Sequence, residues 1–177
     1  MRSLIFFLLA LVFTGASAQR FRSEQSHIKF FSDAPMEDIT AINEEASSIV
    51  DLDSREMVFV VPIKSFQFEK KLMQEHFNEN YLESEKYPKA FFKGKISEWN
   101  GENGENPATA TGELEIHGIK QDVTIEGTII RSDDDTMTIS AVFPVKLEDY
   151  KIKIPKVVFY KIAEEVEVTI KIDYKAL

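Results

Sequence analysis

Alternation of apolar and polar side chains is the feature that most limits what this chain can fold into. At every second position from 166 to 174 the side chain is apolar, and the intervening residues are Glu, Thr, Lys and Asp. Residues 137–147 repeat the pattern, with Met, Ile, Ala, Phe, Val and Leu at alternate positions. Successive side chains of a strand point to opposite faces, so we expect two strands with one buried and one solvated face each.

Eight such strands are expected along the chain. Several of them exceed ten residues, well above the usual length of about five or six. Long strands joined by short turns predict an up-and-down meander that closes on itself, because closure removes the exposed sheet edges. The fold class is therefore all-β, an eight-stranded antiparallel barrel in which the first strand pairs with the last. The expected strands cover residues 23–33, 37–52, 55–66, 89–99, 109–117, 121–131, 136–147 and 163–175.

Residues 69–81 are the one segment with helical periodicity. Its aromatic, histidine and larger apolar side chains recur at i, i+3 and i+4 spacings, which is typical of one face of an amphipathic helix. We expect a short helix that packs across one end or flank of the sheet. The functional alternative for the same position is a lid over a cavity. The residues on this face are Leu72, Met73, His76, Phe77 and Tyr81.

Two other segments interrupt the simple alternation. Residues 57–63 are apolar on both faces, so we expect this strand to be covered on both sides. Residues 100–107 read NGENGENP and contain Asn-Gly twice. Asn-Gly favours tight turns, so this stretch is expected to be a turn-rich loop.

The N-terminus carries the three parts of a secretory signal peptide. Arg2 is followed by an unbroken apolar run over residues 4–13, and residues 16–18 form a small-x-small cleavage site. The run is too short for a bilayer, which needs about 20 residues. We therefore expect residues 1–18 to be removed, residues 19–177 to form one exported domain in a bacterial periplasm, and no stable membrane anchor. A retained N-terminal anchor is the alternative.

Charge and composition exclude several classes of partner and chemistry. The net charge of −9 disfavours nucleic acid phosphates and anionic membranes as partners. The absence of cysteine excludes disulfides, thiol catalysis and thiolate metal sites. His27, His76 and His117 lie far apart without a ligand partner at metal spacing, and no catalytic motif occurs. We expect no catalytic residues, no metal and no cofactor, and the oligomeric state stays open, a homodimer included.

Two motifs resemble the YceI-like family. Residues 72–92 read LMQEHFNENYLESEKYPKAFF, which is similar to the family's short helix with a His-Phe step followed by a (D/E)-x-(E/D)-K-Y-P-x-x-x-F run. Residues 112–125 read GELEIHGIKQDVTI and resemble the family's hairpin around His-Gly. The chain departs from the family pattern at residues 35–45, which lack the usual glycine, and at residues 70–72, where Lys-Lys-Leu replaces the Arg-Asp that often precedes the helix histidine.

The resemblance implies an extended, lipocalin-like eight-stranded barrel, usually periplasmic, and in some members a long isoprenoid or acyl chain in the lumen. We therefore expect a non-catalytic protein that binds an apolar or amphiphilic small molecule. The residues expected to line the lumen or its mouth are Phe59, Val61, Leu72, His76, Phe77, Tyr81, Ile139, Ala141, Phe143, Val168 and Ile170.

Two other functions remain open at this point. An eight-stranded barrel is just wide enough to be filled by side chains or to hold one small ligand. A filled barrel would indicate a structural or interaction module of the cell envelope, so the cavity volume separates the two hypotheses. An enzyme acting on an apolar substrate would need ionisable side chains that converge in the lumen, and the alternating faces offer almost none.

Overall fold

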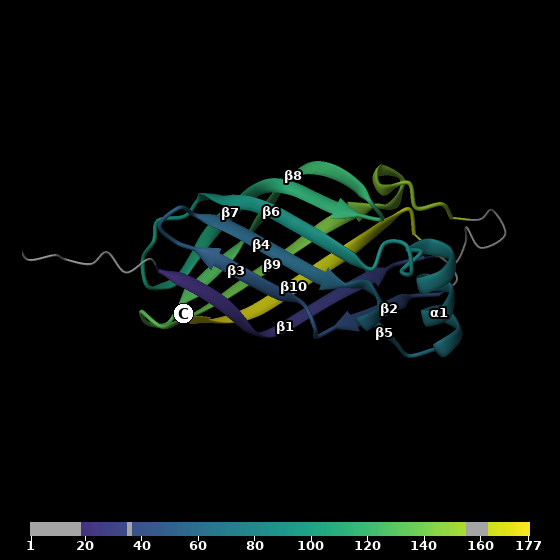
Figure 1. Cartoon of the computed structure of the whole chain (residues 1–177), viewed down its shortest axis with the longest axis horizontal. Helices are drawn as coiled ribbons and strands as arrows, with labels where there is room; N and C mark the ends of the chain where they lie inside the picture. The colour runs from purple at the N-terminus through teal and green to yellow at the C-terminus, as the bar shows by residue number, and fades with distance from the viewer. Residues whose placement is uncertain (1–18, 35–36, 155–162) are drawn as a thin grey trace, which may run out of the picture.

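The computed structural model describes residues 19–34, 37–154 and 163–177, and the expected signal peptide lies outside these ranges (Figure 1). The described residues form ten strands and four short helical segments. The strands are β1 (Arg20–Ser32), β2 (Ile39–Asn43), β3 (Ser47–Asp51), β4 (Glu56–Pro62), β5 (Gln67–Phe68), β6 (Lys89–Glu98), β7 (Gly104–Ile116), β8 (Ile119–Arg131), β9 (Thr136–Lys146) and β10 (Glu165–Ala176). The helical segments are η1 (Ile63–Ser65), α1 (Lys71–His76), η2 (Phe77–Tyr81) and η3 (Leu147–Tyr150).

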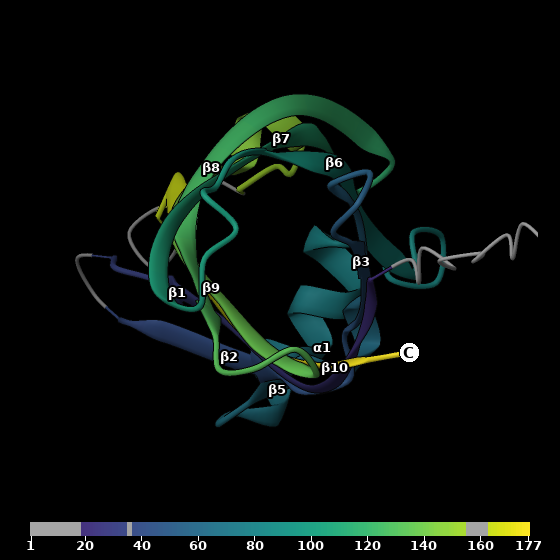
Figure 2. The same cartoon turned by 90° about the vertical axis from the view of Figure 1, so that its left-hand side faces the viewer.

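All ten strands belong to one antiparallel sheet that closes on itself, and Figure 2 shows them as a ring. The closing seam is the pairing of β1 with β10, which runs from Phe21–Ala176 to Phe31–Glu167. Because β10 occupies one edge of β1, β2 and β3 share its other edge, and β4 and β5 share the next position. The barrel therefore has eight strand positions, which confirms the predicted fold and the predicted pairing of the first strand with the last.

Two of the predicted strands are each broken into two parts. Residues 37–52 form β2 and β3, and residues 55–66 form β4 and η1. The fully buried side chain of Asn43 lies at both breaks: its Nδ2 donates to the carbonyl of Pro62 at 2.7 Å, and its Oδ1 accepts from the amide of Glu45 at 2.9 Å. The side chain thus turns the backbone after Asn43 and holds the end of β4.

Two other sequence expectations are wrong. Strand β7 begins at Gly104 rather than near 109, so the loop predicted over 100–107 is shorter. The side chain of Asn106 donates to the carbonyls of Glu102 and Gly104 and stabilises the turn, while Pro107 pairs with β8 beyond the last residue that β6 pairs. The outward face of β4 is not covered, since Val58 is 40% exposed.

The predicted helix over 69–81 forms at one end of the barrel (Figure 1). Its first part is the α-helix α1, and its second part continues as the π-helical turn η2. None of the helices in the described part of the chain is long and apolar enough to cross a membrane.

The buried side chains form two clusters rather than one continuous core. One cluster fills the end of the barrel away from α1; its members are Phe21, Val50, Met57, Phe59, Phe92, Ile96, Ile129, Met137, Ile139, Ile172 and Tyr174. The other lies beneath α1 and η2; it includes Ile28, Ala41, Ile63, Phe66, Leu82, Ala90, Val145, Tyr150, Ile152 and Val166. We call them the distal cluster and the proximal cluster.

Candidate functional site

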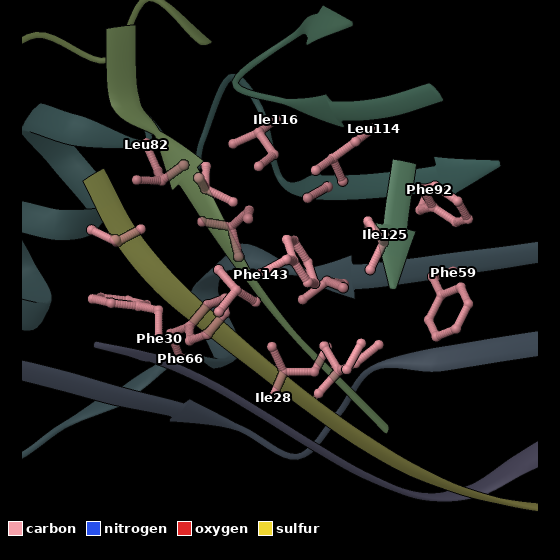
Figure 3. A pocket seen from close by; sticks show the side chains of 18 of the residues that line it. Ile28, Phe30, Phe59, Phe66, Leu82, Phe92, Leu114, Ile116, Ile125 and Phe143 are labelled. Atoms are coloured by element: carbon pink, nitrogen blue, oxygen red, sulfur yellow. The ribbon is translucent and has the colours of Figure 1, made fainter. Parts of the chain in front are cut away.

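A cavity of about 530 Å³ lies inside the barrel, with α1 at one end (Figure 3). The barrel is therefore not filled by its own side chains. Phe30, Val61, Phe143, Val168 and Ile170 face the interior but are only half-buried, because they border this open space. The volume is in the range of about 300–1,000 Å³ that small-molecule sites occupy.

All eleven residues that the sequence predicted for the lumen line this cavity. Seven of them project from the strands: Phe59, Val61, Ile139, Ala141, Phe143, Val168 and Ile170. The other four come from the helical segment: Leu72, His76, Phe77 and Tyr81. Their contact with a ligand stays a prediction.

The prediction missed the contribution of β1, β6, β7 and β8 to the wall. Alternation along these strands marks the inward face, and it was the signal that could have found most of them. The aromatic residues after β4 alternate with Ser65, Gln67 and Glu69, but this run is short and was not used. The missed residues include Ile28, Phe30, Phe66, Phe68, Phe92, Ile96, Leu114, Ile116, Ile125 and Ile129.

Polar groups gather at the α1 end of the cavity. Lys70 forms an ion pair with Glu37, whose hydrogen bond and charge raise the pKa of Lys70. The Nδ1 of His76 lies 2.9 Å from the Asn80 amide, and burial raises the pKa of Tyr81. Leu72 at this end is 62% exposed. The cavity thus has a polar, solvent-accessible mouth.

A cluster of four phenylalanines lies just inside this mouth. Phe77 of η2 packs on Phe30, Phe66 and Phe68, with ring centroids 5.0 to 5.6 Å apart, and Phe30 also contacts Phe66 and Phe68 at 5.6 Å. Phe30 and Phe77 are stacked, with 20° between their planes. The cluster fastens the helical segment to β1 and to the residues around β5.

The opposite end of the cavity is closed. Its floor consists of the distal-cluster residues Met57, Phe59, Phe92, Ile96, Ile129 and Ile139, all of which line the cavity. Phe21, Val50 and Ile172 are fully buried behind the floor. Tyr174 seals the same end, and its hydroxyl donates to Ser48 Oγ at 2.8 Å. The interior therefore has one polar mouth and one sealed apolar end.

Beside the mouth, part of the barrel wall between β8 and β9 has no backbone pairing between strands in the described residues. Within the described residues, β8 pairs with β9 only over Gly127–Arg131 and Met137–Ala141. Segment η3 lies against the remainder of β8, where Gln121 Nε2 donates to the carbonyl of Asp149 at 2.8 Å. Leu147 and Ile152 line the cavity here. Side chains rather than a hydrogen-bonded ladder therefore close this section.

The two family-like motifs meet at His117. Its Nε2 lies 2.7 Å from Glu83 Oε2 and its Nδ1 lies 3.2 Å from the carbonyl oxygen of Tyr150. Each ring nitrogen thus lies at hydrogen-bond distance from an oxygen. The Tyr87 ring packs edge-on against the imidazole, with centroids 4.6 Å apart. His117 thus joins the segment after η2, the β7–β8 turn and η3 in a structural role.

The chemistry of the cavity is that of an apolar container. Among the described residues that line it, the ionisable side chains are Glu37, Lys70, His76 and Tyr81, all at the mouth. No group of three or more His, Asp or Glu residues in the described ranges could hold a metal ion. The arrangement can accommodate an apolar chain along the interior and a polar group at the α1 end.

Comparison with solved structures shows where this architecture recurs. A polyisoprenoid binding domain from Saccharophagus degradans, implicated in plant cell wall breakdown, aligns with a TM-score of 0.77 at 13% identity, covering 91% of this chain and 100% of that one. BcnA of Burkholderia cenocepacia aligns with a TM-score of 0.71 at 20% identity, covering 84% and 95%. A Campylobacter jejuni YCEI protein aligns with a TM-score of 0.59 at 18% identity, covering 73% and 80%.

These identities are low, so the structural likeness shows a shared fold. No curated protein matches the sequence. The model of the YceI-like domain matches residues 20–174, which is nearly the whole of the described barrel. The chain therefore belongs to the YceI-like family.

Proposed function

We propose that this protein is a non-catalytic binding protein that holds a long-chain amphiphile, an isoprenoid or acyl lipid, in the barrel lumen. The observation that carries the proposal is the hollow apolar interior, sealed at the distal cluster and polar at the α1 mouth. The polyisoprenoid binding domain of the same fold supports an isoprenoid chain. The lipid would lie along the barrel interior, with its polar group near Lys70 and His76.

The magnitudes favour useful binding. Burying a chain of ~15 carbons at about 0.8 kcal/mol per methylene gives a gross gain near 12 kcal/mol. Association costs of roughly 4–15 kcal/mol oppose this gain, and a preformed site lies at the low end of that range. The volume of about 530 Å³ is framed by a closed sheet of paired strands, and such a frame keeps the cost of reorganisation low. A barrel packed with side chains, as the structural-module hypothesis requires, would lack this volume.

The position of the ionisable groups supports binding without catalysis. Acid–base chemistry needs titratable side chains that converge on a reacting atom. In the described lining, Glu37 and Lys70 neutralise each other, and His76 bonds to Asn80 on the same helical segment. Among the described lining residues, those between the mouth and the sealed end carry no titratable side chain that could act on a bound lipid.

Export to the bacterial periplasm is part of the proposal. Its support is the three-part signal over residues 1–18. Edman sequencing of protein recovered from the periplasmic fraction should begin near Gln19. Recovery of the chain with Met1 intact would contradict cleavage, without bearing on lipid binding.

The test of lipid binding is extraction of the protein purified from its native host, followed by mass spectrometry of the organic phase. We expect one isoprenoid or acyl species at a stoichiometric ratio. A matched pair of variants assigns it to the lumen: Ala141→Phe fills the cavity, whereas Val142→Phe changes the adjacent side chain, which is 57% exposed.

The lipid should be lost or strongly reduced in Ala141→Phe and retained in Val142→Phe. Equal lipid content in the two folded variants would move the site away from the lumen. Repeated absence of lipid from the native protein, with no uptake of a fluorescent fatty acid in vitro, would overturn the proposal.

A further inference from the structure

We propose that Phe92, supported by a pair of facing glycines, limits the length of the chain that the cavity accepts. This inference rests on the proposed lipid-binding function. It concerns the floor of the cavity, where Figure 3 shows Phe59 and Phe92 together at the end opposite Leu82, Phe30 and Phe66.

The first observation is a place in the sheet without side chains. Gly94 of β6 pairs with Gly112 of β7 across the sheet. A Cβ on Gly94 would lie 2.4 Å from the Thr111 carbonyl oxygen, and a Cβ on Gly112 would lie 2.4 Å from Gly94 Cα. Both distances are far below van der Waals contact, so these two positions require glycine.

The second observation is that the ring of Phe92 occupies the space that Gly94 leaves. Phe92 and Gly94 are two residues apart on β6 and therefore share its inner face. A Cβ on Gly94 would also lie 2.7 Å from Phe92 Cζ, so the ring lies directly over the glycine. The conformation of this aromatic side chain is thus set by a backbone that cannot carry a larger residue.

The third observation is that Phe59 holds the ring from the other side. Phe59 of β4 pairs with Phe92 of β6, and their rings meet edge-on at 6.1 Å with 71° between planes. Both side chains are buried, and the distal cluster packs behind them. A chain that enters from the α1 end therefore meets a rigid aromatic pair backed by tightly packed side chains.

Part of the cavity wall is built from small residues, and two of them, Ala108 and Ala110, pack against the distal cluster. Ala108, Ala110, Gly127 and Ala141 line the cavity on β7, β8 and β9. Removal of the Phe92 ring would therefore add space that is continuous with the existing cavity, rather than a separate void. A longer chain could use this space.

The inference predicts how affinity depends on chain length. Each buried methylene improves affinity about fourfold, as long as it has apolar space to enter. Affinity should therefore rise with length until the chain end reaches Phe92 and Phe59, and then level off or fall because a packed interior resists extra atoms. The turning point measures the distance from mouth to floor.

The experiment measures displacement of a fluorescent fatty acid by two homologous series, straight-chain fatty acids and linear prenyl alcohols. It compares the full mature protein with Phe92→Ala and with Phe92→Leu, a milder variant that keeps an apolar side chain if the alanine variant does not fold. Phe31→Ala is the control, because Phe31 is also on a barrel strand but does not line the cavity.

We expect the turning point to move to longer chains in the Phe92 variants, with at least a tenfold gain for chains beyond the native limit, and to stay in place in Phe31→Ala. An unchanged turning point in a folded Phe92 variant that still binds would overturn the length limit and leave the proposed function intact. Failure of the unmodified protein to bind either series would overturn both.

Discussion

His117 and Glu83 meet through a contact of 2.7 Å between Nε2 and Oε2, and both residues have left-handed backbones, with φ of 54° and 43°. One residue lies in the turn between β7 and β8 and the other follows the helical segment that covers the cavity mouth. The contact therefore links the cover to the barrel across 34 residues of chain. It also brings together the two motifs by which the sequence resembles its family.

The first prediction concerns this pair. His117→Ala should lower the free energy of unfolding by about 1–3 kcal/mol, because it leaves the Tyr150 carbonyl without this donor and removes the Tyr87 packing. Glu83 is about half exposed, so its coupling to His117 in a double-mutant cycle should be only about 1 kcal/mol. Hydrogen exchange should show faster opening of residues 71–86 in His117→Ala and in Glu83→Ala. A coupling of zero would show that the contact between His117 and Glu83 does not hold the helical segment of α1 and η2 against the barrel.

The second prediction separates backbone strain from steric conflict at two glycines with positive φ. Gly118 has φ +69°, and a Cβ there would lie 2.5 Å from the Tyr87 ring. Gly104 has φ +94° and no atom within 4 Å of such a Cβ. Gly104→Ala should therefore cost only the strain of about 1 kcal/mol. Gly118→Ala should cost about 2 kcal/mol more, as measured by urea unfolding. Equal losses would contradict the close approach of Tyr87.

The third prediction concerns Asn43, the buried residue at the breaks between β2 and β3 and between β4 and η1. Asn43→Ala removes the partners of the Pro62 carbonyl and the Glu45 amide, and the loss of these two hydrogen bonds should cost about 1–3 kcal/mol. The melting temperature should fall accordingly. Asn80→Ala is the matched control, since Asn80 is exposed and contacts His76 one turn away; its effect should stay within about 0.5 kcal/mol. Similar effects of the two substitutions would argue against a special role of Asn43.

The fourth prediction is a loss of stability in alkali. Burial, and secondarily the charge of Asp149, raises the pKa of Tyr150 from 10.0 to about 12. Burial also raises the pKa of Tyr174. The unfolded chain releases these protons first and binds fewer of them, so the free energy of unfolding falls as pH rises. The contribution is complete below pH ~10 and is lost as pH rises through the folded pKa.

The measurement for this prediction is urea unfolding at neutral pH and at several pH values between 10.0, the ordinary pKa of tyrosine, and about 12, the pKa of Tyr150 in the folded protein. Tyr150→Phe cannot ionise and should lose less stability over this interval than the unmodified protein. Tyr174→Phe should do the same but should start from a lower value, because it lacks the hydrogen bond to Ser48. Parallel pH profiles for all three proteins would show that the pKa values of these two hydroxyls do not differ between the folded and unfolded chains, and would contradict the prediction.

Local pattern predicted eight strands and, for the last two of them, the face that lines the cavity. Ile139, Ala141 and Phe143 line the cavity because each is two residues from the next, and a strand repeats its orientation with that period. The same reasoning succeeded for Val168 and Ile170 on the last strand. In the helical segment, the 3.6-residue period placed Leu72, His76, Phe77 and Tyr81 on the side that faces the cavity.

The breaks in the strands escaped this reasoning because their cause is distant in sequence. The end of β4 depends on the carbonyl of Pro62 meeting the side chain of Asn43, 19 residues earlier. The early start of β7 depends on the pairing of residues from Gly104 onward with β8, which outweighs the local Asn-Gly turn signal. The phenylalanine cluster at the mouth likewise joins Phe30, Phe66, Phe68 and Phe77 from three separate segments.

The sequence by itself determined the strands of the barrel, the inward face of the last two strands and the helical segment within residues 69–81, because each follows from the period of apolar side chains along one element. Only the tertiary structure decided that the interior is hollow. The open volume depends on how small residues from several strands, such as Ala110, Gly127 and Ala141, combine with large ones such as Phe92 in the cavity wall. Side-chain volumes add up across strands that are distant in sequence, so no single segment contains this information.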